Sequence, residues 1–297
     1  MNSIRTSRVA MRVIREVPTS LRQALAAIGL SGRKLLAATV ALVIVHVFPG
    51  ICFGSYQISP QSGVILDASF GSGGKVVSDL GTDSFATASI IQHDGKIVVA
   101  GCTTATTQGL VNVSGSLMAR YNSDGTIDTT FGANGVTTIT TSGFGVTGIA
   151  LQSDGKILLV GGINLTLEGA FLGQLTLVRL NANGSLDTSF GTNGLVIDSN
   201  GGIGLSVAIQ GDGKIVATGT LEGPGPQLLT VNRYNTDGSL DTTFGTGGTV
   251  HTSPMLASEL VIQKDGKIVL AGQSFATPAV MRLNTDGSPD TGFGTGG

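Results

Sequence analysis

The sequence predicts an all-β protein made of repeated antiparallel sheets, and three observations lead to this prediction. Glycine contributes 46 of 297 residues, roughly twice its average share, whereas charged residues contribute only 12%. Because glycine within a helix costs roughly 0.5–1 kcal/mol relative to alanine, glycines spread this densely favour short strands and tight turns. Three short motifs then recur in a fixed order, which indicates repeated supersecondary units.

The first 65 residues differ from the rest of the chain. Residues 1–34 hold seven basic side chains and one acidic side chain, as in the n-region of a secretory signal. Residues 35–54 contain no charged residue, which predicts a hydrophobic signal segment cleaved ahead of Ser55, with a linker over residues 55–65. An uncleaved anchor is the alternative, since a helix of that length spans about 30 Å.

Charge and cysteine content limit the kinds of partner that the protein can bind and indicate its cellular compartment. After residue 34, 18 Asp and Glu outnumber 10 Lys and Arg, so nucleic-acid binding is not expected. The leader predicts a secreted, cell-surface or periplasmic protein, with membrane contact only through residues 35–54 if they stay uncleaved. Cleavage would leave Cys102 as the one cysteine, so the fold must rest on packing and not on a disulfide.

The first repeated motif, of the form LDxxFGxxG, occurs five times between residues 66 and 297. It divides this region into units of about 66–126, 127–185, 186–239 and 240–288, with the start of a fifth at 289–297. We expect its aromatic side chain to lie in the core between neighbouring units. The five aromatic residues are Phe70, Phe131, Phe190, Phe244 and Phe293.

The second motif, of the form QxDGKI, predicts a β-hairpin in every unit. Asp-Gly between apolar runs is a strong hairpin signal, since both central residues of a type I′ turn need positive φ. This turn would place Ile91 opposite Val98 and Ile90 opposite Val99. The run after each turn is apolar without alternation, as in a strand covered on both faces. The four turns are Asp94-Gly95, Asp154-Gly155, Asp212-Gly213 and Asp265-Gly266.

The third motif begins with an arginine, as in RYNSDG, and completes the unit. We expect the arginine, repeated at one position of the frame, to pair between strands and not to bind an anion. Each unit then offers four strands: one after the FGxxG turn, two in the hairpin and one leading into the arginine. The prediction is a β-propeller-like array of four-stranded antiparallel blades, about four in number, with a parallel β-helix as the rival. The arginines are Arg120, Arg179, Arg233 and Arg282.

These three motifs in register resemble the bacterial delta-60 repeat, and the resemblance covers residues 66–297. It implies a secreted or surface-exposed bacterial protein with propeller-like β repeats. It supplies no catalytic residue, because the biochemical role of that family is largely undefined.

The spacing of the motifs separates fixed from variable parts. From the glycine after each hairpin strand to the next arginine, the separation is 19, 18, 14 and 10 residues, whereas the other separations change little. This predicts one adaptable loop per unit, all on one rim, as the candidate contact surface. Five copies of the first motif accompany four hairpins, which favours a longer array cut after Gly297 over a closed ring of four blades.

One loop has the spacing of a partial calcium site. Asn122, Asp124 and Asp128 stand at positions one, three and seven, but the glutamate expected at position twelve is absent. Asn and Asp also stabilise turns by bonding their own backbone. We therefore expect structural turns here, with calcium as the less favoured alternative and no other cofactor.

No catalytic set stands out in the sequence. Only His93 and His251 lie outside the leader, and we expect both at the solvated surface. The function predicted is an exported, non-enzymatic scaffold or binding module for an unknown macromolecule or envelope component. The alternative is an enzyme of hydrolase or lyase type, with its site in a central channel or in blades missing from this chain.

Overall fold

The computed structural model describes most of the chain after residue 65. The described residues all belong to one compact unit of the chain, Gly54–Gly297. The predicted n-region, signal segment and linker lie outside the described residues. No helix within the described part is long and apolar enough to cross a membrane. The described ranges are 66–80, 83–107, 110–141, 143–167, 170–221, 228–252, 255–274 and 277–297.

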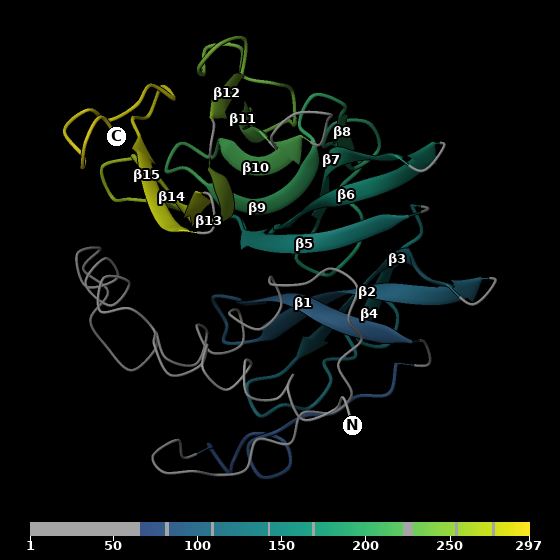
Figure 1. Cartoon of the computed structure of the whole chain (residues 1–297). Helices are drawn as coiled ribbons and strands as arrows, with labels where there is room; N and C mark the ends of the chain where they lie inside the picture. Colours follow the sequence, from purple (N-terminus) through teal and green to yellow (C-terminus); the bar gives the residue numbers. More distant parts are fainter. Residues whose placement is uncertain are drawn as a thin grey trace, which may run out of the picture. The chain divides into compact units, whose positions relative to one another are not determined.

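Within the described residues, fifteen strands form four antiparallel sheets, and each sheet is a meander of strands consecutive in the chain (Figure 1). The first sheet contains β1 (Ser84–Ile91), β2 (Ile97–Thr107), β3 (Leu110–Tyr121) and β4 (Val136–Ile139). The second contains β5 (Phe144–Leu151), β6 (Ile157–Leu167), β7 (Ala170–Leu180) and β8 (Leu195–Asp198). The third contains β9 (Ile203–Ile209), β10 (Ile215–Leu221), β11 (Leu228–Tyr234) and β12 (Thr249–Thr252). The fourth contains β13 (Leu256–Ile262), β14 (Ile268–Ser274) and β15 (Thr277–Leu283).

This architecture confirms the predicted all-β fold of antiparallel, propeller-like blades, although the sheets are offset from the units of the sequence. In the first three sheets, the strand after the FGxxG turn pairs with the strand ahead of it, as β4 pairs with β3 through Ala119 opposite Val136. The backbone of Arg120 fixes this return, because its N–H donates to the Gly135 carbonyl and its carbonyl accepts from the Asp128 N–H. The FG motif therefore joins the last two strands of one sheet.

The register of the hairpin differs from the prediction by one residue. Ile91 pairs with Ile97, not Val98, and Ile90 pairs with Val98, not Val99. The turn consequently contains three residues and not two.

Hydrogen bonds and dihedral angles explain the longer turn. Gln92 N–H donates to the Lys96 carbonyl at 2.8 Å, and Gly95 N–H donates to the Gln92 carbonyl at 2.9 Å. Only Gly95 has positive φ, at 83°, so the type I′ prediction is wrong. Three-residue hairpins combine a type I turn with one left-handed residue, which suits a glycine after Asp94. The matching glycines with positive φ are Gly155, Gly213 and Gly266.

The core lies between the sheets. Ile157 and Leu159 on β6 face the first sheet, whereas Leu158 and Val160 face the third. All four side chains are fully buried, which confirms for the second sheet that the apolar run is covered on both faces. In the first sheet the prediction holds for one face only, because Ile97 and Val99 are only partly buried. The first strand of each later sheet contacts the preceding sheet: β5 contacts β1 to β3, β9 contacts β5 to β7, and β13 contacts β9 to β11. Of the five motif phenylalanines, Phe131, Phe190 and Phe244 are fully buried between sheets, whereas Phe70 and Phe293 are only partly buried.

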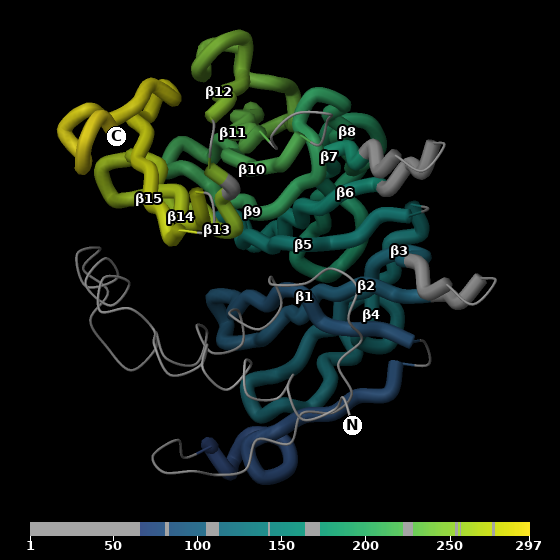
Figure 2. Tube along the Cα trace, viewed as in Figure 1, coloured from purple at the N-terminus to yellow at the C-terminus, as the bar shows by residue number. Residues whose placement is uncertain are grey.

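Chain direction gives every sheet two different ends (Figure 2). The Asp-Gly turn, the turn after the arginine and the FG loop lie at one end, which we call the motif end. At the opposite end, which we call the hairpin end, β2, β6, β10 and β14 finish and β3, β7, β11 and β15 start.

The segment predicted as a variable loop is a paired hairpin. Strands β6 and β7 pair along their whole length, from Ile157 opposite Leu180 to Leu167 opposite Ala170. Each has 11 residues, whereas β10 and β11 have seven each. At about 3.3 Å per residue, the longer arms extend the hairpin by about 13 Å. The extra length of the second sheet is therefore taken up by added strand pairs at the hairpin end.

We predict that Phe190→Ala lowers the free energy of unfolding by about 3–5 kcal/mol, because it empties a fully buried site between two sheets. Shortening β6 and β7 to seven residues each should cost much less, since the hairpin end is not fixed in length. Urea denaturation of both variants measures the difference. Equal losses would contradict the view that the variable segment lies outside the core.

Candidate functional site

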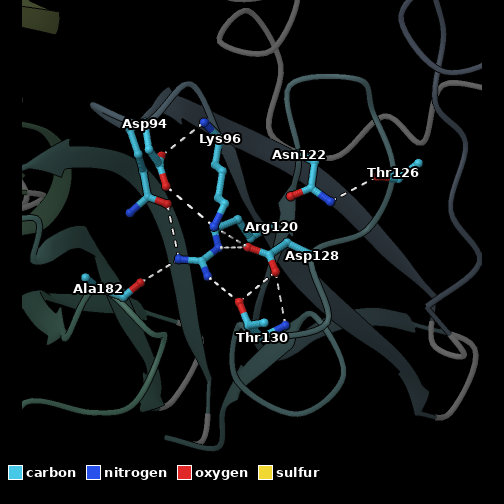
Figure 3. A network of polar contacts seen from close by, with 9 residues as sticks. Asp94, Lys96, Arg120, Asn122, Thr126, Asp128, Thr130 and Ala182 are labelled. Atoms are coloured by element: carbon cyan, nitrogen blue, oxygen red, sulfur yellow. Dashed lines mark hydrogen bonds and ion pairs between the residues drawn. The ribbon is translucent and has the colours of Figure 1, made fainter.

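The motif end carries a polar network centred on the repeated arginine (Figure 3). In the first sheet, Arg120 Nε donates to Asp128 Oδ2 at 2.8 Å and Nη2 donates to Thr130 Oγ1 at 3.1 Å. Its Nη1 donates to Gln92 Oε1 at 3.3 Å. Lys96 Nζ lies 3.1 Å from the same Asp128 oxygen. Two cations therefore share one buried carboxylate.

The same arginine reaches the next sheet. Arg120 Nη1 donates to the Ala182 carbonyl oxygen at 2.7 Å, in the turn that follows β7. The guanidinium carbon lies 4.8 Å from the centroid of the Phe131 ring. Beside it, Gly132 N–H donates to the Asn183 carbonyl oxygen at 2.8 Å. We call this arrangement the interface clip, because it fastens the arginine and FG loop of one sheet to a turn of the next.

The interface clip recurs with the same parts. In the second sheet Arg179 donates to the Thr236 carbonyl oxygen, and in the third sheet Arg233 donates to the Thr285 carbonyl oxygen. Each acceptor lies in the turn that follows the third strand of the next sheet. The corresponding FG-loop glycines, Gly191 and Gly245, donate at 2.8 Å to the carbonyls of those turns. The matching arginine, aspartate and phenylalanine sets are Arg179, Asp187 and Phe190; Arg233, Asp241 and Phe244; and Arg282, Asp290 and Phe293.

Close backbone approach at the clip requires a glycine in the receiving turn. Gly184 has φ of +86°, and a Cβ added there would lie 2.6 Å from Thr137 Oγ1 and 2.8 Å from the Phe131 ring. Any larger residue at this position would push the two sheets apart.

The electrostatics of the clip keep its aspartates ionised. The Thr130 hydroxyl donates to Asp128 Oδ1 at 2.7 Å, and this bond, with Lys96 and Arg120 on the other oxygen, holds the pKa of Asp128 well below its usual range. The Ser189 hydroxyl has the leading effect in lowering the pKa of Asp187. For Asp241, the Lys214 ammonium is the leading cause of the lowered pKa.

The structure places the residues of the partial calcium spacing in separate roles. Asp128 faces Arg120 and Lys96, whereas Asp124 Oδ1 accepts from the Thr126 N–H and hydroxyl. Asn122 Nδ2 donates to Thr126 Oγ1 at 3.0 Å. Within the described ranges, no group of three or more His, Cys, Asp or Glu side chains is placed to hold a metal ion.

The two histidines lie at exposed positions on different sheets, His93 in the β1–β2 turn and His251 on β12. His93 lines a depression of about 740 Å³ where the Asp-Gly turns of the first three sheets meet. Gln152 and Gln210 also line it, and their buried carboxamide oxygens have no hydrogen-bond partner. In the first sheet the corresponding oxygen, on Gln92, accepts from Arg120.

Sequence reasoning missed the partners of the arginine. The spacing of eight residues between each arginine and its aspartate, as between Arg120 and Asp128, is constant in all four repeats and could have indicated the pair. The lysine of each DGK sequence, such as Lys96, recurs at one frame position as well. The calcium interpretation drew attention to Asp128 without indicating these cations.

Meandering sheets, each clipped face to face onto the next, define a β-propeller repeat protein. Four segments, residues 92–131, 152–190, 210–244 and 263–293, match the model of a domain of unknown function, the DUF5122 β-propeller. This match over four repeats supports a propeller-repeat family for the chain.

Solved structures that align with this chain include one of an unknown-function protein from Dyadobacter fermentans, at 14% identity and a TM-score of 0.45, over 76% of this chain and 65% of that chain. Another is a protein of unknown function from Bacteroides caccae, at 13% identity and a TM-score of 0.41, over 72% of this chain and 68% of that chain. A third is a GH43_1 enzyme from Xanthomonas citri, at 11% identity and a TM-score of 0.41, over 69% of this chain and 71% of that chain. Likenesses at these TM-scores support no conclusion about function. No curated protein matches the chain.

We predict that Arg179→Ala destabilises the protein by about 3–5 kcal/mol, because it leaves Asp187 buried without its main partner. The matched control is Lys156→Ala, which removes the other cation on the same carboxylate. Its side chain is 31% exposed, so the loss should be about 0–1 kcal/mol. Urea unfolding at neutral pH compares the two. A similar loss of unfolding free energy in both variants would show that the Asp187 carboxylate needs only a nearby positive charge and not the arginine in particular.

We also predict that stability falls as pH drops below about 4. The pKa values of Asp128, Asp187 and Asp241 are lowered in the folded protein, whereas an unfolded aspartate titrates near about 3.9. Their stabilisation is therefore complete above the unfolded value and is lost as pH falls, because the unfolded chain binds the protons first.

Urea midpoints measured between neutral and acid pH test this dependence on the aspartates. Asp187→Asn should be less stable than the unmodified protein at neutral pH, but its midpoint should fall less steeply in acid. An unchanged slope would mean that other groups cause the acid sensitivity.

Proposed function

We propose that this protein is an exported, non-catalytic scaffold that binds a macromolecule at the hairpin end of its sheets. One observation carries the proposal: the motif end is fixed in length and fastened by the interface clip, whereas the hairpin end differs from sheet to sheet. In repeat proteins, the face that carries length variation is commonly the binding face.

The chemistry of the motif end supports a structural role for its charged residues. The arginine, lysine and aspartate side chains that recur there bind one another, as Arg179, Lys156 and Asp187 do. The Nη1 atom of Arg179 also donates to the Thr236 carbonyl oxygen of the next sheet. Because these side chains hold neighbouring sheets together, we expect the partner to be recognised by other surfaces of the protein.

The geometry of the hairpin end supports a macromolecular partner. The long hairpins β2–β3 and β6–β7 belong to sheets that pack against each other, since β5 contacts β1 to β3. Two neighbouring hairpins present an extended backbone surface of the kind that large partners use, in contrast to a closed pocket for a small molecule. The hairpins β10–β11 and β14–β15 are shorter, which makes this surface asymmetric.

The leader supports export, because residues 1–34 are basic and residues 35–54 are uncharged and apolar. The resemblance to delta-60 repeats agrees with this location. An exported scaffold would meet components of the cell envelope, so we infer that its partner lies there. Enzymatic activity of hydrolase or lyase type is the alternative.

We predict that purified protein is retained on an immobilised bacterial envelope fraction, and that shortening β6 and β7 to seven residues each abolishes this retention. Lys156→Ala, which removes a partly exposed charge at the motif end, is the matched control and should bind normally. Circular dichroism and thermal melting check that both variants stay folded.

Equal retention of the shortened variant and the unmodified protein would exclude the hairpin end as the binding surface. Depolymerisation of an envelope polysaccharide by both proteins would favour the enzyme alternative.

A further inference from the structure

The depression at the motif end is lined mainly by the second and third sheets, and we call it the turn depression. Its volume of about 740 Å³ lies within the range of about 300–1,000 Å³ that is common for small-molecule sites. It lies beside the Asp-Gly turns, at the end of the sheets opposite the hairpins. Its lining includes Leu151, Gln152, Arg179, Ser189, Gln210 and Gly211.

A side chain is missing from the wall of the turn depression. The residue ahead of each Asp-Gly pair carries a side chain at His93, Ser153 and Lys264, whereas the third sheet has Gly211. Gly211 is exposed, and a Cβ added there would meet no atom within 4 Å. Its φ is not positive, so the turn itself does not require glycine at this position. The absent side chain therefore leaves open space in the depression without serving the backbone.

The turn depression has an unused hydrogen-bond donor. In the first and third sheets, Nη2 of the clip arginine donates to a threonine hydroxyl, at 3.1 Å to Thr130 (Figure 3) and at 3.2 Å to Thr243. The second sheet has Ser189 at that position, and Arg179 Nη2 makes no hydrogen bond with a described residue. Because Arg179 and Ser189 both line the depression, this donor is available to an oxygen atom of a ligand.

The turn depression also has unused hydrogen-bond acceptors. Gln152 and Gln210 are each 8% exposed, and the Oε1 atom of each has no partner among the described residues. In the first sheet, by contrast, Gln92 Oε1 accepts from Arg120 Nη1. A buried acceptor without a donor is unfavourable, and the terminal torsion of glutamine rotates over a broad range. Either carboxamide can therefore turn its oxygen toward a hydroxyl group held in the depression.

The charges that line the turn depression cancel, so the lining favours neither an anion nor a cation. Apolar contact comes from Leu151 and Ile209, which stand at the same frame position on β5 and β9 and are both half-buried. The depression thus combines hydrogen-bonding groups of both kinds with two aliphatic side chains. The charged residues of the lining are Asp154, Lys156, Arg179 and Asp237.

We propose that the turn depression binds an uncharged saccharide. A sugar hydroxyl both donates and accepts hydrogen bonds, so one ligand accepts from Arg179 Nη2 and donates to Gln152 and Gln210. The C–H face of a sugar ring packs on Leu151 and Ile209, as apolar surface removed from water favours. This inference goes beyond the proposed function, because it adds a second binding site at the end opposite the hairpins.

NMR titration of the full chain with neutral trisaccharides of glucose, mannose, galactose and N-acetylglucosamine tests the proposal. We predict that at least one binds with a dissociation constant of about 1 mM or below. Gly211→Trp should abolish binding, because its side chain fills the open space. The matched control is Lys264→Trp, which places the same side chain at the same frame position of the fourth sheet and should bind normally. Failure of all four sugars to bind, or normal binding by Gly211→Trp, would overturn the proposal.

A second variant separates ligand recognition from folding. Gln152→Met keeps the length of the side chain and removes an oxygen that has no partner, so stability should not fall. Affinity for the sugar should fall roughly three- to tenfold, as for the loss of one hydrogen bond. Gln92→Met is the matched control: it removes an oxygen that is bonded to Arg120, so it should lower stability and leave affinity unchanged. Unchanged affinity in Gln152→Met would contradict the assigned site.

Two further measurements define the ligand class and keep the two proposals apart. A trisaccharide of galacturonic acid should bind no better than its neutral galactose counterpart. Much tighter binding of the acidic sugar would indicate an anion site on Arg179 and would overturn the proposal of an uncharged ligand. The variant with shortened β6 and β7 should bind the neutral sugar as the unmodified protein does, so the saccharide site and the envelope-binding surface are tested separately.

Discussion

The guanidinium of Arg120 extends out of its own sheet and donates to the Ala182 carbonyl oxygen in the next, and the stacking of the sheets depends on this bond and its repeats. A cation between sheets is costly to desolvate unless it is fully paired. Asp128, Thr130 and the Phe131 ring meet that requirement from one short loop. The loop must return to the arginine after a single turn, which explains why the aspartate always follows its arginine by eight positions in the sequence.

The position of the interface clip at one end leaves the other end free to change. Strands β6 and β7 lengthen together, because every added residue finds its hydrogen-bond partner in the opposite arm. Nothing at the motif end needs to adjust, since the arginine, the FG loop and the Asp-Gly turn are all fixed on that side. The motif end therefore keeps the sheets stacked, whereas the hairpin end is the part that differs between sheets.

Much of the fold could be predicted from repetition and apolar patterning. The run from Ile157 to Val160 indicated a strand covered on both faces, and it is one. The turn length could not be predicted in this way, because Asp-Gly fits both a two-residue turn and a three-residue turn that ends in glycine. The partner of each arginine was also missed. Pairing between Arg120 and Asp128 depends on how the FG loop folds back, which spacing alone does not specify.

The sameness of the interface clip has a consequence for how such a gene can change in length. Every junction uses one arginine, one aspartate, one phenylalanine and a glycine-containing turn at the same positions. Unequal recombination between two repeats would delete or insert a unit and join a first half from one sheet to a second half from another. Because the halves are interchangeable, the new joint would inherit a complete contact. Sheet number could then drift between related genes without a loss of stability at the seam.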